Sequence, residues 1–434
     1  MLLHTSTTDG TARHGSPLWL HADWIAVLIE GILLAIGVAF IYGAGVEVGG
    51  DLANKWYRQL AWIGLGGGIY VVAATVDYHF WGRHSWLLYL GGVALLLIVL
   101  LFGRTLNNTK GWLLVPGIGF LQPVELAKPL TLVFLSWLGT RPALRHSSLG
   151  EWLPAIVLTL VMLLPVGLIC LQPDLGTAMV FIPVTLALIF LTGLRWRWFF
   201  LGFGILILIT PLLYVSLKPY QQDRVKVFIG PPATQLLHLT APMLSKQTEA
   251  HARESLAKFL EPREGEGKSD DWNAVQSLLA VGSGGFSGKG YLKGTQHVLG
   301  YLPRTIAPTD FIFSVIAEET GFIGAATLLA LLTGLMLCFC RTALLARDRL
   351  GTFIAIGVAV IFTTHIVINI SMTIQAAPIV GLPLPFISYG GSFMLGTMLL
   401  AGLVQSVELH RRRAHLSFAS DPGESDEQEE KLNT

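Results

Sequence analysis

The chain has 434 residues, of which 53% are hydrophobic and only 13% are charged, and its formal net charge is +1. This composition is too apolar for a soluble globular protein of that length, so we expect a polytopic membrane protein. The small net charge offers no concentrated basic surface, which argues against nucleic-acid binding. Cys170, Cys338 and Cys340 lie in or beside apolar segments without the spaced His/Cys neighbours of a metal site.

Apolar runs long enough to cross a bilayer, about 17 to 25 residues each, follow one another along the chain. They begin near Trp24, Leu60, Trp86, Glu151, Thr177, Trp196, Phe311, Gly351 and Ser388, with a shorter run after Gln122. The sequence therefore predicts an all-α membrane protein with about ten transmembrane helices in residues 21–412. Segment 1–20 precedes this domain, and an acidic tail, 413–434, follows it and is expected to be disordered.

Arginine residues are concentrated in one set of the loops between these runs. This set contains Arg83, Arg141, Arg145, Arg195, Arg197, Arg341, Arg347, Arg349 and the run Arg411 to Arg413. The turns around Gln172 and Ala377, on the other side, carry no lysine or arginine. Because positively charged loops stay in the cytoplasm, we expect both termini to be cytoplasmic. The long loop 218–310, between the seventh and eighth helices, is then external.

Loop 218–310 is the only sizeable polar region. An amphipathic stretch between Pro242 and Pro262 predicts a short helix on the external surface, and a dedicated binding module is the alternative. After Trp272 the glycines of GSGGFSGKG, 282–290, predict tight and exposed backbone. The loop ends at Asp310, a single acid at the point where the chain enters an apolar helix.

Other polar side chains occur at helix ends on the same side as this loop. They are Gln122, Glu125, Lys128, Gln172, Asp174 and the run from Ser388 to Ser392. Taken alone, each has an ordinary explanation, such as helix capping by Asp174 or Asp310. Their convergence on one face instead indicates a functional site with Asp310 as the candidate catalytic base.

Further charged and polar residues could belong to the same site. Glu318 and Glu319 follow Asp310 into the apolar helix, where a charge needs a polar cavity or a partner, and an ion pair with a base such as Lys128 is the structural alternative. His365 and Asn369 could line the cavity, although hydrogen-bonded packing is the simpler interpretation. The external cations, which could bind an anionic head group, are Lys110, Lys128, Arg224, Lys289 and Lys293.

These residues fall in motifs that resemble the SEDS family of peptidoglycan glycosyltransferases, the group of RodA, FtsW and the sporulation homologues. The matching segments, in the family's order between about residues 60 and 412, are KGW (110–112), QPVELAK (122–128), LQPDLGT (171–177), YQQDR (220–224), VGSGGFSGKGYLKGTQ (281–296), TDFIFSVIAEETG (309–321) and GLPLPFISYGGS (381–392). APIVGLPLP is closer to RodA, because FtsW proteins usually carry a lysine where Val380 stands. The chain departs from the family at Arg304, where Glu is common, at Pro308, where His is common, and in a longer insertion at about 232–270.

The resemblance implies a lipid II substrate, a disaccharide-pentapeptide on undecaprenyl diphosphate, and a location in the bacterial cytoplasmic (inner) membrane. Asp310 would deprotonate the acceptor hydroxyl, a role in which one carboxylate suffices because the leaving diphosphate is already a stable anion. Lys110, Arg224, Lys289 or a divalent cation such as Mg²⁺ or Mn²⁺ would neutralise that diphosphate. The remaining members of the substrate-binding cavity are Glu125, Lys128, Asp174, Glu319 and Ser388.

Two functions of another class remain as alternatives: a flippase or transporter for the lipid-linked precursor, and a non-catalytic scaffold of the wall-synthesis complex. A transporter would hold its key charges near the bilayer midplane, whereas this cluster is expected at the external face. The resemblance also implies a class B penicillin-binding protein as partner, within an elongation complex that contains MreC and MreD.

Overall fold

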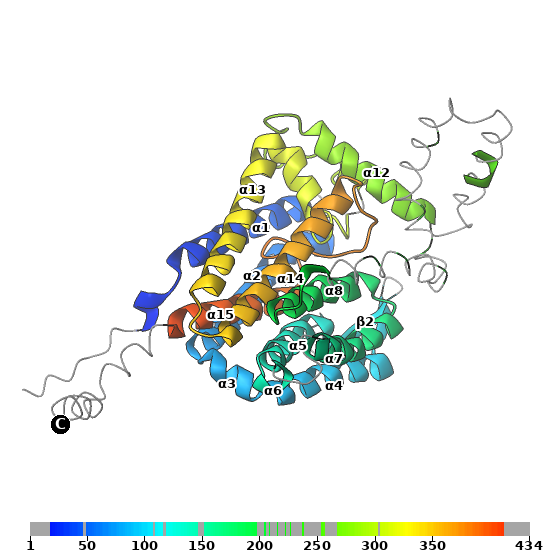
Figure 1. Ribbon diagram of the computed structural model, residues 1–434. Coiled ribbons are helices and arrows are strands. Elements are labelled where there is room, and N and C mark those ends of the chain that lie inside the picture. The colour runs from blue at the N-terminus through cyan, green and yellow to red at the C-terminus, as the bar shows by residue number, and fades with distance from the viewer. Residues whose placement is uncertain are drawn as a thin grey trace, which may run out of the picture.

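The apolar runs of the sequence form helices, because a backbone in hydrocarbon must satisfy its hydrogen bonds internally. Figure 1 shows the arrangement of these helices in the computed structural model. The structure describes residues 18–46, 49–106, 109–115, 119–145, 152–197, 253–256, 267–302 and 304–411, with single positions between 204 and 237. Most of segment 1–20, the tail 413–434, and the predicted amphipathic stretch between Pro242 and Pro262, apart from residues 253–256, lie outside the described residues.

Each predicted span coincides with a helix, except the run near Trp196, which lies largely outside the described residues. The helices at these positions are α1 (Trp24–Val46), α2 (Lys55–Thr75), α4 (Ser85–Phe102), α5 (Val124–Gly139), α7 (Trp152–Leu171), α8 (Leu175–Leu191), α13 (Ile312–Leu345), α14 (Arg349–Thr373) and α15 (Gly391–His410). Within the described part of the chain, six of them are long and apolar enough to cross a bilayer: α1, α4, α7, α13, α14 and α15. The polytopic all-α class is confirmed, and the total of ten spans stays a prediction.

Shorter elements connect these helices. They are η1 (Leu18–His21), η2 (Gly50–Leu52), α3 (Tyr78–Arg83), α6 (Pro142–Arg145) and α12 (Gly267–Ser283). The sequence analysis expects no strands, yet β1 (Arg104–Leu106), β2 (Thr109–Val115) and β3 (Gly119–Leu121) form an antiparallel sheet in the order β1-β2-β3. This segment is too short to cross the bilayer, and pairing with its own neighbours satisfies its backbone groups.

Helix α15 occupies the centre of the bundle and packs against α2, α5 and α14. Nearly all of its residues are buried. Small residues allow the close approach: a side chain at Gly402 would lie 2.7 Å from the carbonyl oxygen of Tyr70 on α2, and one at Gly396 would lie 2.5 Å from that of Glu125 on α5. The start of α15 is therefore held firmly against the helices that carry the predicted site.

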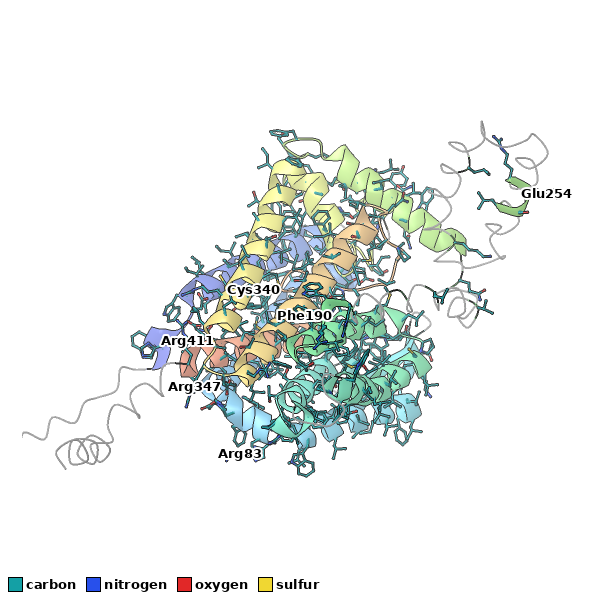
Figure 2. The ribbon with its side chains drawn as sticks, viewed as in Figure 1. Arg83, Phe190, Glu254, Cys340, Arg347 and Arg411 are labelled. Carbon is teal, nitrogen blue, oxygen red and sulfur yellow. The ribbon has the colours of Figure 1, made fainter. Side chains whose placement is uncertain are left out.

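Both ends of the described chain lie at the same end of the molecule. The N-terminal η1 contacts α15, and Asp23, which precedes α1, forms an ion pair with Arg341 of α13 at 3.2 Å. Figure 2 shows Arg83, Arg347 and Arg411 gathered at this end, away from α12. This arrangement agrees with an even number of spans and with the predicted grouping of the arginine-bearing loops.

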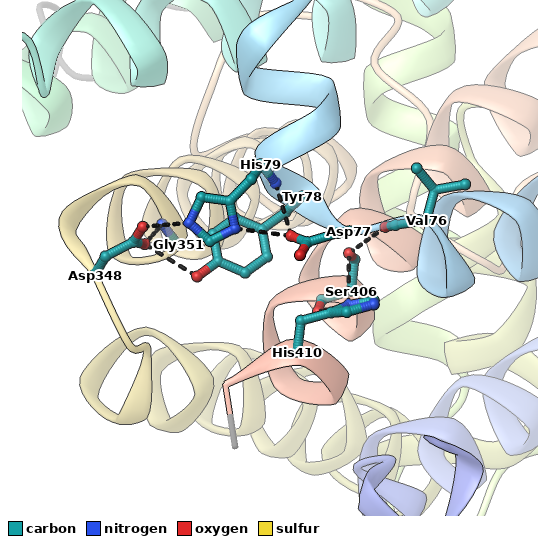
Figure 3. Close-up of polar contacts among 8 residues, drawn as sticks. All are labelled: Val76, Asp77, Tyr78, His79, Asp348, Gly351, Ser406 and His410. Atoms are coloured by element: carbon teal, nitrogen blue, oxygen red, sulfur yellow. Dashed lines mark hydrogen bonds and ion pairs between the residues drawn. The ribbon is translucent and has the colours of Figure 1, made fainter. Parts of the chain in front are cut away.

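A bridge of charged side chains ties two connections together at the arginine-bearing end (Figure 3). The imidazole of His79 lies between two carboxylates, with Nδ1 2.8 Å from Asp77 and Nε2 2.7 Å from Asp348. The hydroxyl of Tyr78 donates to Asp348 at 3.1 Å. Asp77 also caps α3 and Asp348 caps α14, so the bridge joins the α2–α3 corner to the α13–α14 corner.

Helix α13 is broken at Gly321, where φ is 66° and ψ is −161°. The glycine-rich segment 284–290 replaces the lost helical hydrogen bonds: Lys289 and Gly290 donate to the carbonyls of Glu318 and Glu319, and Phe322 donates to Gly285. A side chain at Gly288 would collide with the carbonyl oxygen of Glu319. The predicted tight and exposed backbone is confirmed for residues 285–287, which are exposed, whereas Gly284 is buried and Gly288 serves close approach to α13.

Candidate active site

Asp310 lies in a tight turn directly before α13. The amides of Thr309, Asp310 and Phe311 all donate to the carbonyl oxygen of Ile306, at 3.0 to 3.3 Å. Phe311 is the N-cap residue of α13, and the helix start has no side-chain capping bond. The capping explanation for Asp310 is therefore wrong, and its carboxyl group is placed outside the helix.

Four hydrogen bonds from distant parts of the chain hold this turn. The Ser388 hydroxyl donates to the carbonyl of Thr309 at 2.6 Å, and the Tyr389 amide donates to that of Pro308 at 2.9 Å. The Asn369 amide donates to the carbonyl of Asp310 itself at 2.9 Å. The fourth bond runs from Lys55 Nζ to the carbonyl of Thr305, at 3.1 Å. The position of Asp310 is thus fixed by α2, by α14 and by the connection that follows α14.

The connection between α14 and α15, residues 374–390, is the surface on which the site is built. Its carbonyl groups lie close to two glycines: a side chain at Gly37 of α1 would lie 2.7 Å from the oxygen of Ile387, and one at Gly176 of α8 would collide with that of Val380. A side chain at Gly381 would lie 3.4 Å from Oδ2 of Asp310. Phe386 has a φ of 65°, a strained value that persists only where surrounding contacts enforce it.

Helix α2 supplies a positively charged side chain, Lys55, that interacts with Asp310. Lys55 interacts electrostatically with Asp310, and its Nζ lies 5.1 Å from the centre of the Tyr389 ring. Burial raises the pKa of Tyr389 against the opposing effect of Arg58, so the phenol stays neutral. The ammonium group of Lys55 and the ring of Tyr389 therefore lie close together beside the turn that carries Asp310.

A second group of predicted residues forms a buried chain. Lys128 Nζ lies 2.7 Å from Oε2 of Glu125 and 3.1 Å from Nε2 of His365. The side chains of Glu125 and Lys128 are 4% and 2% exposed, so this is an internal ion pair rather than a solvated one. The structural alternative for Glu318, an ion pair with a basic residue, is confirmed, but the base is Lys289. Lys128 instead pairs with Glu125, one turn away on the same helix.

A third group joins the starts of α5, α8 and α15. Gln122 donates its backbone amide to Ser392 at 2.8 Å and its side-chain amide to Asp174 at 3.2 Å. Asp174 accepts from the Thr177 amide at 3.0 Å and caps α8, so the capping explanation is confirmed for this acid. Lys110, on β2, joins this group through its backbone amide, which donates to Gln172 at 3.1 Å.

A fourth group lies at the break in α13. Lys289 Nζ forms an ion pair with Glu318 at 2.5 Å and also donates to the Thr295 hydroxyl at 2.9 Å. The Glu319 carboxylate accepts from the amide of Leu292 at 3.1 Å. Lys289 is the partner that Glu318 needs in an apolar helix, and both acids fasten the glycine-rich segment to α13.

The structure thus brings Ser388 into contact with Thr309, the residue before Asp310, and places Glu125 with Lys128, Asp174 with the Lys110 strand, and Lys289 with Glu318. Arg224 lies outside the described residues. Within the described part of the chain, no group of three or more His, Cys, Asp or Glu residues could hold a metal ion.

The sequence analysis missed Lys55 and Gln59 as members of the site. Gln59 donates to the carbonyl of Ser388 at 3.3 Å and accepts from the Gly390 amide at 3.2 Å. The two residues are four apart, which puts them on one face of α2. That spacing of a cation and an amide at the start of an apolar helix is the signal that could have found them.

Comparison with known proteins identifies the family. The model of the FtsW, RodA and SpoVE family, described as cell cycle proteins, matches residues 23–236 and 232–413. The chain belongs to this family. It is accordingly a multi-pass membrane protein, as its apolar helices indicate.

Relatives of the FtsW, RodA and SpoVE family align over nearly the whole chain. The peptidoglycan glycosyltransferase RodA of Treponema pallidum is 31% identical over 434 aligned positions, which cover 89% of this chain and 97% of the relative. The peptidoglycan glycosyltransferase MrdB of Escherichia coli K12 is 32% identical over 402 positions, with 91% and 95% coverage. Because the alignments cover 97% and 95% of the two relatives, nearly all of each relative has a counterpart in this chain.

Solved structures of the family share the fold. One belongs to a study of polymerization and crosslinking by a peptidoglycan synthase complex; it has a TM-score of 0.69 and 27% identity, and the alignment covers 91% of this chain and 100% of the other. The rod shape determining protein RodA of Thermus thermophilus has a TM-score of 0.61 and 26% identity, with 92% and 100% coverage.

Proposed function

We propose that this protein is a peptidoglycan glycosyltransferase that polymerises lipid II for cell-wall elongation and the maintenance of rod shape, with Asp310 as the general base. The names of the relatives support the activity, and the geometry around Asp310 supports the residue. The observation that carries the proposal is the turn before α13, where four long-range hydrogen bonds hold the backbone around Asp310 and Lys55 interacts electrostatically with its carboxyl group.

The reaction needs one proton acceptor and a group that tolerates negative charge. The hydroxyl oxygen of the acceptor sugar attacks the anomeric carbon of the lipid-linked chain, and its proton passes to Asp310. A new glycosidic bond forms, the bond from the anomeric carbon to the diphosphate oxygen breaks, and the electron pair leaves with the diphosphate. No general acid is required, because the diphosphate is stable as an anion.

Cations near Asp310 stabilise the charge that develops on the leaving diphosphate. Lys55 is the cation that interacts with Asp310, and we add it to Lys110 and Arg224 as a diphosphate-binding residue. Lys289 is neutralised by Glu318, which suits a role in holding the glycine-rich segment rather than the substrate. If a divalent cation such as Mg²⁺ or Mn²⁺ binds together with the diphosphate, Asp310 would help to hold it, and the cation would neutralise the charge of the leaving group.

The buried groups around this centre hold its geometry. Glu125, Lys128 and Asp174 have their charges and hydrogen bonds satisfied within the protein, so they shape the cavity wall without having to move. Glu319 and Ser388 hold the segments on either side of Asp310. A preorganised site of this kind lowers the barrier, because attack geometry is set before the substrate arrives.

The same proposal includes a place in the cell and a partner. With the arginine-bearing end in the cytoplasm of a bacterial inner membrane, both termini are cytoplasmic and Asp310 faces the outside, where lipid II would be presented. The similarity to a complex that couples polymerization with crosslinking supports a class B penicillin-binding protein as partner. MreC and MreD are the further partners that membership of an elongation complex would bring.

The decisive experiment compares glycan-chain formation from lipid II by the purified parent protein and by Asp310→Asn, each with and without the penicillin-binding partner. Asp421→Asn is the matched control, because it makes the same chemical change in the acidic tail, beyond the transmembrane domain 21–412. We expect polymer from the parent and the control and none from Asp310→Asn. Equal polymer from all three would remove Asp310 from catalysis. No polymer from the folded parent with its partner present would favour a flippase or a scaffold.

A further inference from the structure

Two buried residues of α14 face the connection 374–390 but are not needed to explain the proposed chemistry. His365 and Asn369 are four residues apart and lie one above the other on the same face of the helix. Their exposed fractions are 1% and 0%. A polar side chain at such depth needs hydrogen-bond partners, and each of the two has a backbone carbonyl group of the adjacent connection as one of its partners.

Asn369 links the turn that carries Asp310 to the connection 374–390. Its Nδ2 donates to the carbonyl of Asp310 at 2.9 Å and to that of Leu382 at 2.7 Å. Both hydrogens of the amide are therefore in use. Gly381, the residue before Leu382, is the one that lies against the Asp310 carboxyl group. Asn369 thus fixes the backbone of Asp310 and the surface beside its side chain at the same time.

His365 links the same connection to the buried ion pair. Its Nδ1 lies 3.0 Å from the carbonyl of Pro383, and its Nε2 lies 3.1 Å from Nζ of Lys128. An ammonium group only donates, so Nε2 must accept and Nδ1 must carry the proton that is donated to Pro383. The imidazole is therefore neutral and held in one tautomer. Lys128 is itself held by Glu125 at 2.7 Å.

We propose that Asn369 and His365 are positioning residues for Asp310, which connect it to the Glu125–Lys128 ion pair through the adjacent carbonyls of Leu382 and Pro383. This inference rests on the proposed function of Asp310 as the base. It also explains the buried ion pair, which orients His365. His365 and Asn369 then hold the connection 374–390. The connection and Asn369 together keep Asp310 in the position needed to accept the proton. Neither α14 residue touches the substrate.

Residue 369 must be able to donate two hydrogen bonds. A leucine has the same branched shape and the same number of side-chain heavy atoms but no polar hydrogen to donate, so Asn369→Leu leaves two carbonyl groups without their donor. The turn at Asp310 is then released on one side, and a misplacement of about 1 Å can reduce a rate by about 100-fold. We expect kcat to fall at least about tenfold while KM for lipid II changes less than about threefold.

The test measures lipid II polymerisation, thermal unfolding and amide hydrogen exchange for the parent, Asn369→Leu, His365→Phe and Thr364→Val. Thr364→Val is the matched control, since Thr364 is on the same helix and its hydroxyl bonds only within it, to Val360 at 2.7 Å. In Asn369→Leu, we expect faster exchange in residues 304–311. In His365→Phe, we expect faster exchange in residues 376–390 and a smaller loss of kcat. The control should behave as the parent does.

Exchange and activity separate the possible failures. Unchanged exchange at 304–311 together with a parental kcat in Asn369→Leu would overturn the inference. Faster exchange throughout the helices with a matching loss of thermal stability would also overturn it, because the residue would then serve stability alone. If the folded parent forms no polymer, the proposed function fails, whereas the exchange measurement still decides whether Asn369 holds the Asp310 turn.

Discussion

A single hydroxyl, that of Ser388, holds much of the backbone beside Asp310. It donates to the carbonyl of Thr309 and accepts from the amide of Leu384 at 2.8 Å. Ser388→Ala leaves both groups buried without that partner, which should cost about 1–3 kcal/mol of stability. Because Thr309 adjoins Asp310, we expect lipid II polymerisation to fall more than the loss of stability explains. Thermal unfolding and polymerisation of the purified variant check both effects.

The control for this substitution is Ser283→Ala. The Ser283 hydroxyl donates only to the carbonyl of Ala280, three residues earlier in the same helix, at 2.9 Å. It should be close to neutral in both measurements. If Ser388→Ala were as stable and as active as Ser283→Ala, the clamp on Thr309 would be unimportant.

At the same residue scale, the sequence identified the acids but not their separate roles. Asp174 and Asp310 both stand before apolar helices, so the local pattern predicts a cap for either. The structure makes Asp174 a cap, whereas the tight turn on Ile306 shifts the start of α13 and leaves Phe311 at the capping position. The spacing of Lys55 and Gln59 marks one face of α2, but the contact of Lys55 with residue 305 joins segments 250 positions apart, so the sequence does not show which turn that face holds.

At the scale of elements, the glycine-rich segment can be tested through its contact with the break in α13. Gly288 has a φ of +77°, and a side chain there would collide with the carbonyl oxygen of Glu319. The unfavourable conformation alone costs of order 1–3 kcal/mol for a residue other than glycine. We therefore expect Gly288→Ala to lower the unfolding temperature strongly and to loosen the Lys289–Glu318 pair.

The matched control is Gly282→Ala, six residues earlier. A side chain at Gly282 would meet nothing within 4 Å, and its φ is not positive. Because it ends a helical segment, alanine there should be neutral or slightly stabilising. Equal unfolding temperatures for the two variants would contradict the view that the segment is built on close approach to α13.

The sequence predicts an element well where the bilayer alone determines its backbone structure. It does not predict an element whose structure depends on contacts with another segment of the chain. Apolar length alone located α1, α4, α7, α13 and α14, because hydrocarbon permits no other backbone structure. The break at Gly321 depends on a segment some thirty residues earlier that supplies replacement hydrogen bonds, and it has no signal in the helix beyond one glycine. The small sheet was missed because its short strands bond mainly to one another, apart from the Lys110 amide, which donates to Gln172.

At the scale of the whole molecule, the bridge around His79 makes stability depend on pH. Hydrogen bonds to Asp348 and then to Asp77 raise the pKa of His79, although partial burial opposes them. Partial burial works against the shift in both carboxylates as well, yet the hydrogen bonds from His79 keep the pKa of Asp77 and of Asp348 below its usual value. All three groups are therefore charged together over a range of pH.

The sign of each shift fixes that range. A raised histidine pKa contributes stability that is complete below the unfolded value of about 6.5 and is lost as pH rises through the folded value. A lowered carboxylate pKa contributes stability that is present above about 3.9 and is lost as pH falls through the folded value. The bridge is therefore complete between about pH 4 and 6.5. It weakens above that range because His79 loses a proton, and a neutral imidazole can donate to only one of the two carboxylates.

We therefore expect the unfolding temperature of the parent protein in detergent to fall between pH 6 and pH 8.5, and His79→Gln to remove most of that dependence. His84→Gln is the control, because His84 lies on the same connection but its Nδ1 contacts only the carbonyl of Phe80, at 3.0 Å. The α2–α3 and α13–α14 corners that the bridge joins belong to the helices that converge on Asp310 at the other end. If His79→Gln kept the parental slope, the pH dependence would have to come from another group, and the bridge would contribute little to holding these helices together.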